Sequence, residues 1–284
     1  MTSKSQELLK FYLRFWNKKA EIDKVLQQGA LDIPESLAHC CRLLFKKTAK
    51  THVASMAGAP TISIYVRKEY QLLCSHLQSC DQPGVVVLGS PGIGKSVFNI
   101  YALARHLPEA IYVTSTSDPA EQTIPFIFNA AGVRPLDLYE KDLGLFGFPP
   151  HTWCLYDSTP RGVQPNSKLV EETFLVFTVA PDTSRYDGVL KQGFDTWYMN
   201  PWDFDEITAF LKTQHQVADK DVYNVTGGYI RDYRLAQRNQ DSQDIVKTNI
   251  DAAVVTVASA ARHPRIVNQQ PSPLGIGHQL FALY

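Results

Sequence analysis

The stretch GVVVLGSPGIGKS, residues 84–96, decides how this chain folds. Residues 84–88 form a continuous apolar run between Pro83 and Gly89, which is typical of a strand buried on both faces of a parallel sheet. Residues 89–96 fit the pattern G-x-x-x-x-G-K-[ST], whose glycines let the backbone curl and turn successive N–H groups towards one point. Helical periodicity then runs from residue 95 to about residue 106. Strand, glycine-rich loop and helix in this order are the context of a phosphate-binding loop.

This loop predicts a site for a nucleoside triphosphate, most simply ATP, together with Mg²⁺. Lys95 would place its charge between the β- and γ-phosphates, and Ser96 would offer a hydroxyl to Mg²⁺. The helix that begins here adds the positive end of its dipole. The residues expected to contact the nucleotide are Gly89, Ser90, Pro91, Gly92, Ile93, Gly94, Lys95, Ser96 and Val97.

Asp157 ends a second apolar run, TWCLYD at residues 152–157. This is the pattern of a Walker B strand, whose carboxylate would hold the Mg²⁺ shell opposite Ser96. The alternative is an aspartate that only caps the turn at Ser158-Thr159-Pro160.

The catalytic base is harder to assign. Many ATPases place a glutamate directly after the Walker B aspartate to polarise the attacking water, whereas here that position is Ser158. Thr178, at the end of the run TFLVFT, is a candidate to contact the γ-phosphate or the water, and equally a candidate to satisfy a strand end. Arg161 and Arg185 are candidate arginine fingers or, by default, surface arginines.

Arg231 follows a Gly227-Gly228 turn and sits at the expected start of a helix. A small C-terminal lid could carry this guanidinium to the phosphates. A solvated helix position is the alternative.

The rest of the chain predicts an α/β fold, namely a P-loop NTPase with an open, mostly parallel sheet flanked by helices. We expect N-terminal helices in residues 1–60, the NTPase core in residues 61–215, and a small helical lid and tail in residues 216–284. The expected strands are residues 84–88, 110–114, 152–156, 173–178 and 195–199, and the expected helices include residues 5–29, 35–47, 64–78, 95–106, 122–131 and 203–213.

Composition and charge limit the partners and the cellular compartment that we expect for this chain. The formal net charge is zero, so global charge does not favour a nucleic-acid partner, although residues 1–50 carry ten Lys/Arg against five Asp/Glu. The five cysteines have no C-x-x-C spacing, so we expect free thiols in a reducing compartment and no disulfides. The same lack of spacing argues against a metal site at His39-Cys40-Cys41. Without a visible signal peptide or membrane-length apolar run, we expect a cytoplasmic or nuclear protein that binds nucleotide and has a possible protein partner or self-association.

With these residues in place, the chain resembles the P-loop ATPase module of Crinkler-type effectors and of retrotransposon hot spot proteins. The similarity covers about residues 60–235. Its stretches are YVRKEY at residues 65–70, the phosphate loop with Phe98, YMNPW at residues 198–202 with Glu206, and GGYIR at residues 227–231. The resemblance implies an ATPase of the signalling type, with Arg231 as a sensor arginine.

Several functions stay open at this level. The chain is either an ATPase, fast or slow, that acts as a nucleotide-dependent switch, or a module that binds ATP and is gated by it without hydrolysis. A truncated effector whose nuclease domain is missing is a further alternative. A nuclease built on Asp241, Asp244 and Lys247, or a small-molecule kinase, is less favoured, because the three charged residues look like a solvated helix face.

Overall fold

The computed structural model describes residues 8–9, 11–13, 30–34, 61–106, 110–114, 125–136, 148, 152–158 and 164–261. The chain forms two compact units. Residues 89–94, 180–182 and 199 onwards belong to the second unit, and the remainder belongs to the first. Within the described ranges, no helix is both long enough and apolar enough to cross a bilayer.

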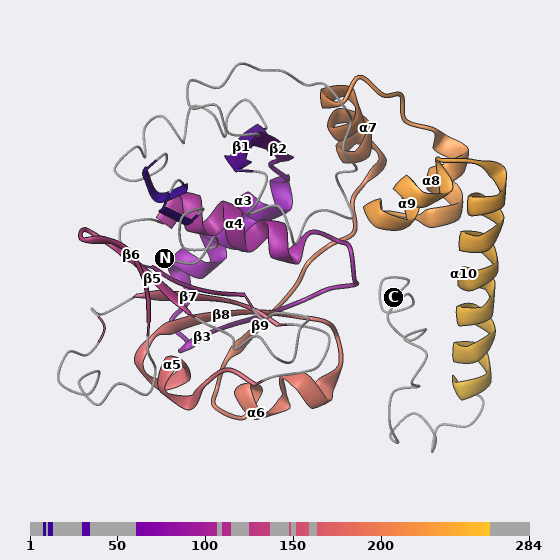
Figure 1. Ribbon diagram of the computed structural model, residues 1–284. Helices are drawn as coiled ribbons and strands as arrows, with labels where there is room; N and C mark the ends of the chain where they lie inside the picture. Colours follow the sequence, from indigo (N-terminus) through magenta and orange to yellow (C-terminus); the bar gives the residue numbers. More distant parts are fainter. Residues whose placement is uncertain are drawn as a thin grey trace. The chain divides into compact units, whose positions relative to one another are not determined.

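A seven-stranded sheet forms the centre of the first unit (Figure 1). Its order is β6-β5-β4-β7-β8-β3-β9, and the last five strands in that order run parallel. The strands are β3 (Gly84–Leu88), β4 (Ala110–Thr114), β5 (Phe126–Asn129), β6 (Gly132–Pro135), β7 (Trp153–Asp157), β8 (Phe174–Val179) and β9 (Asp195–Tyr198). The predicted α/β fold with a mostly parallel sheet is confirmed, as are its five parallel strands.

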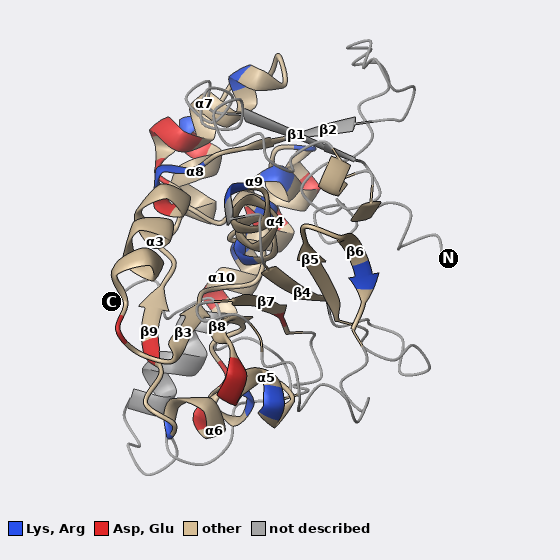
Figure 2. Ribbon diagram, turned by 90° about the vertical axis from the view of Figure 1, so that its left-hand side faces the viewer, with Lys and Arg blue, Asp and Glu red and all other residues tan. Residues whose placement is uncertain are grey.

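Helices cover both faces of this sheet (Figures 1 and 2). The helices α3 (Lys68–Ser79) and α4 (Lys95–His106) lie on one face, and α5 (Ser167–Glu172) and α6 (Asp187–Leu190) lie on the other. The double cover explains why β3 is apolar at every position, since each of its side chains is buried. Burying each of its valines and Leu88 contributes about 1.5–3 kcal/mol.

Residues 126–135 correct one expectation from the sequence. The helix expected over residues 122–131 is instead a hairpin of β5 and β6, the antiparallel edge of the sheet. Phe126 and Phe128 alternate with half-buried neighbours, which is a strand period. Asn129 then accepts a hydrogen bond from the backbone N–H of Ala131, and Gly132 takes a φ of +118°. This turn chemistry ends the strand before a helix can form.

The helix expected over residues 64–78 begins later than predicted. Residues Thr61–Tyr65 form β2, which pairs antiparallel with β1 (Ala30–Pro34), and α3 follows from Lys68. The alternating, β-branched stretch TISIY favours a strand. The expected helices at residues 5–29 and 35–47 lie almost entirely outside the described residues, apart from helical turns at residues 8–9 and 11–13.

The second unit is helical. Its helices are α7 (Phe204–Thr213), α8 (Lys220–Thr226), α9 (Ile230–Ala236) and α10 (Gln240–Ala261). Asp203 caps α7 by accepting a hydrogen bond from the backbone N–H of Glu206. The last three helices pack against one another. On α10, Asp241, Asp244 and Lys247 are exposed, in line with the solvated helix face expected there.

Candidate functional site

The phosphate loop joins β3 to α4 with the local geometry that its glycines permit. Gly92 has a φ of +84° and Gly94 a φ of +115°, which L side chains rarely adopt. The backbone N–H of Ile93 donates to the carbonyl of Ser90, closing a tight turn. No acidic residue occupies the first turn of α4. The N-terminal end of this helix therefore keeps its full positive dipole, as an anion site requires.

In the first unit, the structure brings Ser96 and Asp157 together. Their side chains are hydrogen-bonded, and the positive charge of Lys95 acts on the same carboxylate. Asp157 is the last residue of β7 and stands level with Thr178 of β8, while Thr178 stands level with Val87 of β3. Three predicted site residues, from α4 and β7, thus meet at the carboxyl ends of parallel strands, where ligands bind in open α/β sheets.

Burial raises the pKa of the Asp157 carboxyl above its ordinary value. The hydrogen bonds with Ser96 and Thr178 and the charge of Lys95 oppose this rise but do not cancel it. A carboxylate in this position gains from a cation that replaces its lost hydration. A serine hydroxyl and a carboxylate are both hard oxygen donors, so the pair fits Mg²⁺, which takes oxygen ligands.

Thr178 is buried, and its hydroxyl is hydrogen-bonded to other groups of the protein. Its Oγ1 accepts a hydrogen bond from Nδ2 of Asn99 at 2.9 Å and lies 3.0 Å from Oδ1 of Asp157, to which it donates. The carbonyl oxygen of Tyr156, at 3.2 Å, is an alternative acceptor. This arrangement favours a role for Thr178 in orienting the Asp157 carboxylate.

Sequence reasoning missed Asn99. It is fully buried, one turn after Lys95 on α4, and its Oδ1 has no hydrogen-bond partner although its Nδ2 has one. An unpaired buried acceptor is costly, so the position is not explained by packing alone. A polar residue inside the apolar stretch VFNIYALA was the available signal.

In the second unit, Trp202 holds the phosphate loop. Its indole Nε1 donates to the carbonyl oxygen of Ile93 at 2.9 Å, and its backbone N–H donates to the carbonyl of Gly228. Gly228 has to be glycine, because a Cβ there would lie 2.1 Å from the carbonyl oxygen of Trp202. Trp202 of YMNPW and Gly228 of GGYIR are therefore in direct contact. Trp202 was noted in the sequence only as part of a resemblance, without this role.

Arg231, the first-turn arginine of α9, packs on the same loop. A Cβ added at Gly92 would lie 2.6 Å from the Cβ of Arg231 and 2.9 Å from its Nε. That Nε is buried and has no hydrogen-bond partner. The neighbouring Tyr229 is hydrogen-bonded to the side chain of Ser90. The guanidinium of Arg231 thus lies against the loop with one N–H donor, Nε, still available for a hydrogen bond.

The remaining predicted site residues are two members of the phosphate-loop region and two candidate arginine fingers. Pro91 is exposed, whereas Val97 is buried in α4 among core residues. Arg185 lies in the short turn Thr183–Arg185, and its carbonyl oxygen accepts a hydrogen bond from Gln164. Arg161 lies outside the described residues.

The strand order, the glycine loop after β3 and the acidic end of β7 define the class of this protein, an α/β P-loop NTPase fold. No family model and no curated protein matches the chain. Similar solved structures include the Walker-type ATPase PABY2304 of Pyrococcus abyssi, at a TM-score of 0.38 and 13% sequence identity, over 71% of this chain and 75% of that chain. The assignment of the class therefore rests on the topology and the loop.

Proposed function

We propose that the chain binds ATP with Mg²⁺ through the phosphate loop and acts as a nucleotide-dependent switch of the Crinkler and retrotransposon hot spot type. The observation that carries the proposal is the hydrogen-bonded pair Ser96–Asp157 beside Lys95. These residues come from the first turn of α4 and the end of β7, and their chemistry matches triphosphate and metal binding.

Each group has a role that follows from its chemistry. The loop N–H groups and the start of α4 bind phosphate oxygens, and Lys95 neutralises charge at the β- and γ-phosphates. Ser96 and Asp157 hold Mg²⁺, which when bound neutralises charge on the phosphate oxygens. Thr178 and Asn99 keep the Asp157 carboxylate in place through their hydrogen bonds.

The second unit supplies the response to the nucleotide. Trp202 and Arg231 both contact the loop. A change in loop conformation therefore alters the contacts made by the segment before α7 and by the segment after α8. Arg231 is the candidate to report the γ-phosphate, because its unpaired Nε lies against Gly92. Differential contact with ATP and ADP is what a switch requires.

Binding without rapid hydrolysis is the second candidate function. Ser158 follows Asp157, and its backbone N–H donates to the carbonyl of Thr178. A serine cannot act as the carboxylate base that activates water. We therefore expect turnover to be slow compared with typical enzymes, whose kcat is about 1–1000 per second.

The test is calorimetric titration of ATP and ADP, with and without Mg²⁺, followed by single-turnover hydrolysis with the protein in excess. Magnesium-dependent ATP binding supports the proposal. Hydrolysis within the lifetime of the complex identifies an ATPase, and stable bound ATP identifies the non-hydrolysing switch. Absence of ATP binding overturns both.

A further inference from the structure

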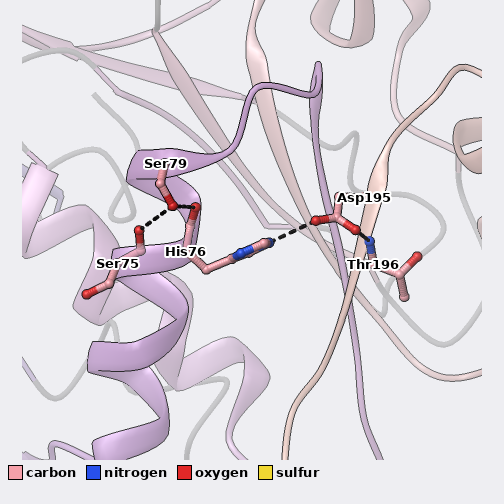
Figure 3. Close-up of polar contacts among 5 residues, drawn as sticks. All are labelled: Ser75, His76, Ser79, Asp195 and Thr196. Carbon is pink, nitrogen blue, oxygen red and sulfur yellow. Dashed lines mark hydrogen bonds and ion pairs between the residues drawn. The ribbon is translucent and has the colours of Figure 1, made fainter.

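Three potential metal ligands converge in the first unit away from the phosphate loop. They are His76, Cys80 and Asp195, and their ligand atoms all lie within 4.8 Å of one another. Figure 3 shows the imidazole of His76 pointing from α3 towards the carboxylate of Asp195. Among the described residues, this is the cluster of three His, Cys, Asp or Glu side chains close enough to share one ion.

The end of α3 places two of the three ligands. His76 and Cys80 are four residues apart, a spacing that puts side chains on one face of a helix. Cys80 directly follows the last residue of α3. Ser79 secures this end, because its hydroxyl lies 3.2 Å from the carbonyl oxygen of Ser75 and 3.1 Å from that of His76, either of which it can donate to (Figure 3).

Asp195, the first residue of β9, supplies the third ligand. Its Oδ2 lies 3.0 Å from Nε2 of His76, an ion pair when the imidazole is protonated. Its Oδ1 accepts a hydrogen bond from the backbone N–H of Thr196 at 2.6 Å, which fixes the carboxylate orientation (Figure 3). A ligand held by a second hydrogen bond is the usual arrangement in metal sites.

Trp197 packs against the imidazole of His76. Its ring lies 5.0 Å from that of His76, centroid to centroid, and its Nε1 donates to Oε1 of the buried Glu69 at 2.9 Å. Glu69 and His76 lie on the same helix, so Trp197 and Asp195 tie α3 to β9 at two points. The ligands thus sit on a braced scaffold.

The residues of the cluster are partly exposed, although Nε2 of His76 itself is buried. The side chains of His76 and Asp195 are 29% and 41% exposed, and Cys80 is a partly exposed free thiol. In contrast, Cys74 and Cys154 are buried, and burial raises the pKa of each to about 12. Among the described cysteines, Cys80 is therefore the accessible thiol.

The donor set selects the kind of ion. One imidazole nitrogen, one thiolate and one carboxylate oxygen suit Zn²⁺, whereas Mg²⁺ prefers oxygen ligands throughout. We propose that His76, Cys80 and Asp195 bind Zn²⁺ in a tetrahedral site completed by water. The bound ion would connect the end of α3 to the edge strand β9. Binding releases the thiol proton, and any proton held between His76 and Asp195, to solvent.

This site is separate from the proposed Mg²⁺ site. Asp195 stands level with Val85 at the beginning of β3, whereas the phosphate loop follows Leu88 at its other end. Three residues of parallel strand span about 10 Å. The Zn²⁺ site therefore belongs to the opposite end of the strand.

The test uses the untagged full chain with Cys40 and Cys41 changed to serine, so that a cobalt–thiolate signal from those residues is removed. Titration with Co²⁺ is followed by the thiolate charge-transfer absorption and by quenching of tryptophan fluorescence. We expect one equivalent to bind, Zn²⁺ to displace it and Mg²⁺ not to. His76→Gln, Cys80→Ser and Asp195→Asn should each weaken binding by at least about tenfold, since even outer-sphere changes cost that much. His215→Gln and Asp187→Asn are the matched controls.

Two further measurements guard against misfolded variants. Thermal unfolding without metal should give similar midpoints for all the variants, and Zn²⁺ should raise the midpoint less in each ligand variant than in the parent. Zn²⁺ should also slow the reaction of Cys80 with a thiol reagent. The proposal is overturned if no thiolate band forms, if the band survives Cys80→Ser, or if His76→Gln and Asp195→Asn bind Co²⁺ as tightly as the parent. Those results would leave an ordinary surface ion pair.

Discussion

The indole Nε1 of Trp202 donates a hydrogen bond to the carbonyl oxygen of Ile93, 109 residues earlier in the chain, across 2.9 Å. Both groups are buried. The bond fixes the orientation of one peptide unit inside the phosphate loop, two residues before Lys95. Loop preorganisation therefore depends on a tryptophan that lies outside the loop in sequence.

Trp202→Phe should weaken ATP binding by about fivefold to tenfold. The phenyl ring keeps most of the packing against Phe210 but leaves the Ile93 carbonyl without its donor, a loss of about 1–1.5 kcal/mol. Calorimetric titration measures the change. Trp197→Phe is the matched control, because it removes a tryptophan hydrogen bond from β9 instead and should leave ATP affinity unchanged. Equal effects of the two variants would refute the bracing role.

Lys95→Ala should weaken ATP binding by about tenfold to a hundredfold, because a charge-assisted contact worth about 1.5–3 kcal/mol is lost. Fluorescent nucleotide titration provides the measurement. Lys212→Ala, at an exposed position of α7, should bind ATP like the parent. Unchanged affinity in Lys95→Ala would remove the central claim of the proposed function.

Asp157→Asn should lose the dependence of ATP affinity on Mg²⁺ and keep most of the affinity measured in EDTA. The substitution removes a metal-binding charge but leaves the loop N–H groups and Lys95 in place. The quantity to compare is the ratio of dissociation constants with and without Mg²⁺. The same ratio in variant and parent would make Asp157 a strand cap only.

The same variant should also be more stable than the parent when both are metal-free at neutral pH. Burial raises the pKa of Asp157 in the folded state, so the folded protein holds this proton more tightly than the unfolded chain, and ionisation above that pKa costs stability. The advantage of Asp157→Asn should shrink as the pH falls towards and below 3.8, where the carboxyl is protonated in both states. Thermal unfolding in EDTA at several pH values checks this, and a variant that is less stable at neutral pH would contradict it.

Arg231→Ala should reduce ATP affinity by about tenfold to a hundredfold and leave ADP affinity almost unchanged. The reason is that only ATP presents the γ-phosphate to the guanidinium, which keeps its charge at any relevant pH. Parallel titrations with both nucleotides measure the difference. Arg234→Ala, on the same helix but bonded to Gln216, is the control. Parallel loss of ATP and ADP binding would instead indicate a damaged second unit and would count against a sensor role.

The two segments that the sequence misassigned share a cause. Residues 126–135 and 61–65 are short, and their period of two is visible only over four or five residues, so helical and extended patterns compete. For the hairpin, the pairing of β5 with β4 on one side and with β6 on the other decides the outcome, because β5 gains ladder hydrogen bonds that a short helix there would not make.

The sequence by itself determined the parallel strands and predicted the phosphate loop with Lys95, Ser96 and Asp157, because each depends on local backbone chemistry or on a continuous apolar run. Only the tertiary structure revealed that Asn99 reaches Thr178, that Trp202 holds Ile93, that Arg231 packs on Gly92 and that His76 faces Asp195. These contacts join residues about eighty to about a hundred and forty positions apart in the sequence. Periodicity and propensity report a residue's own segment, whereas such contacts depend on strand order and helix placement, which the chain acquires only when the whole sheet assembles.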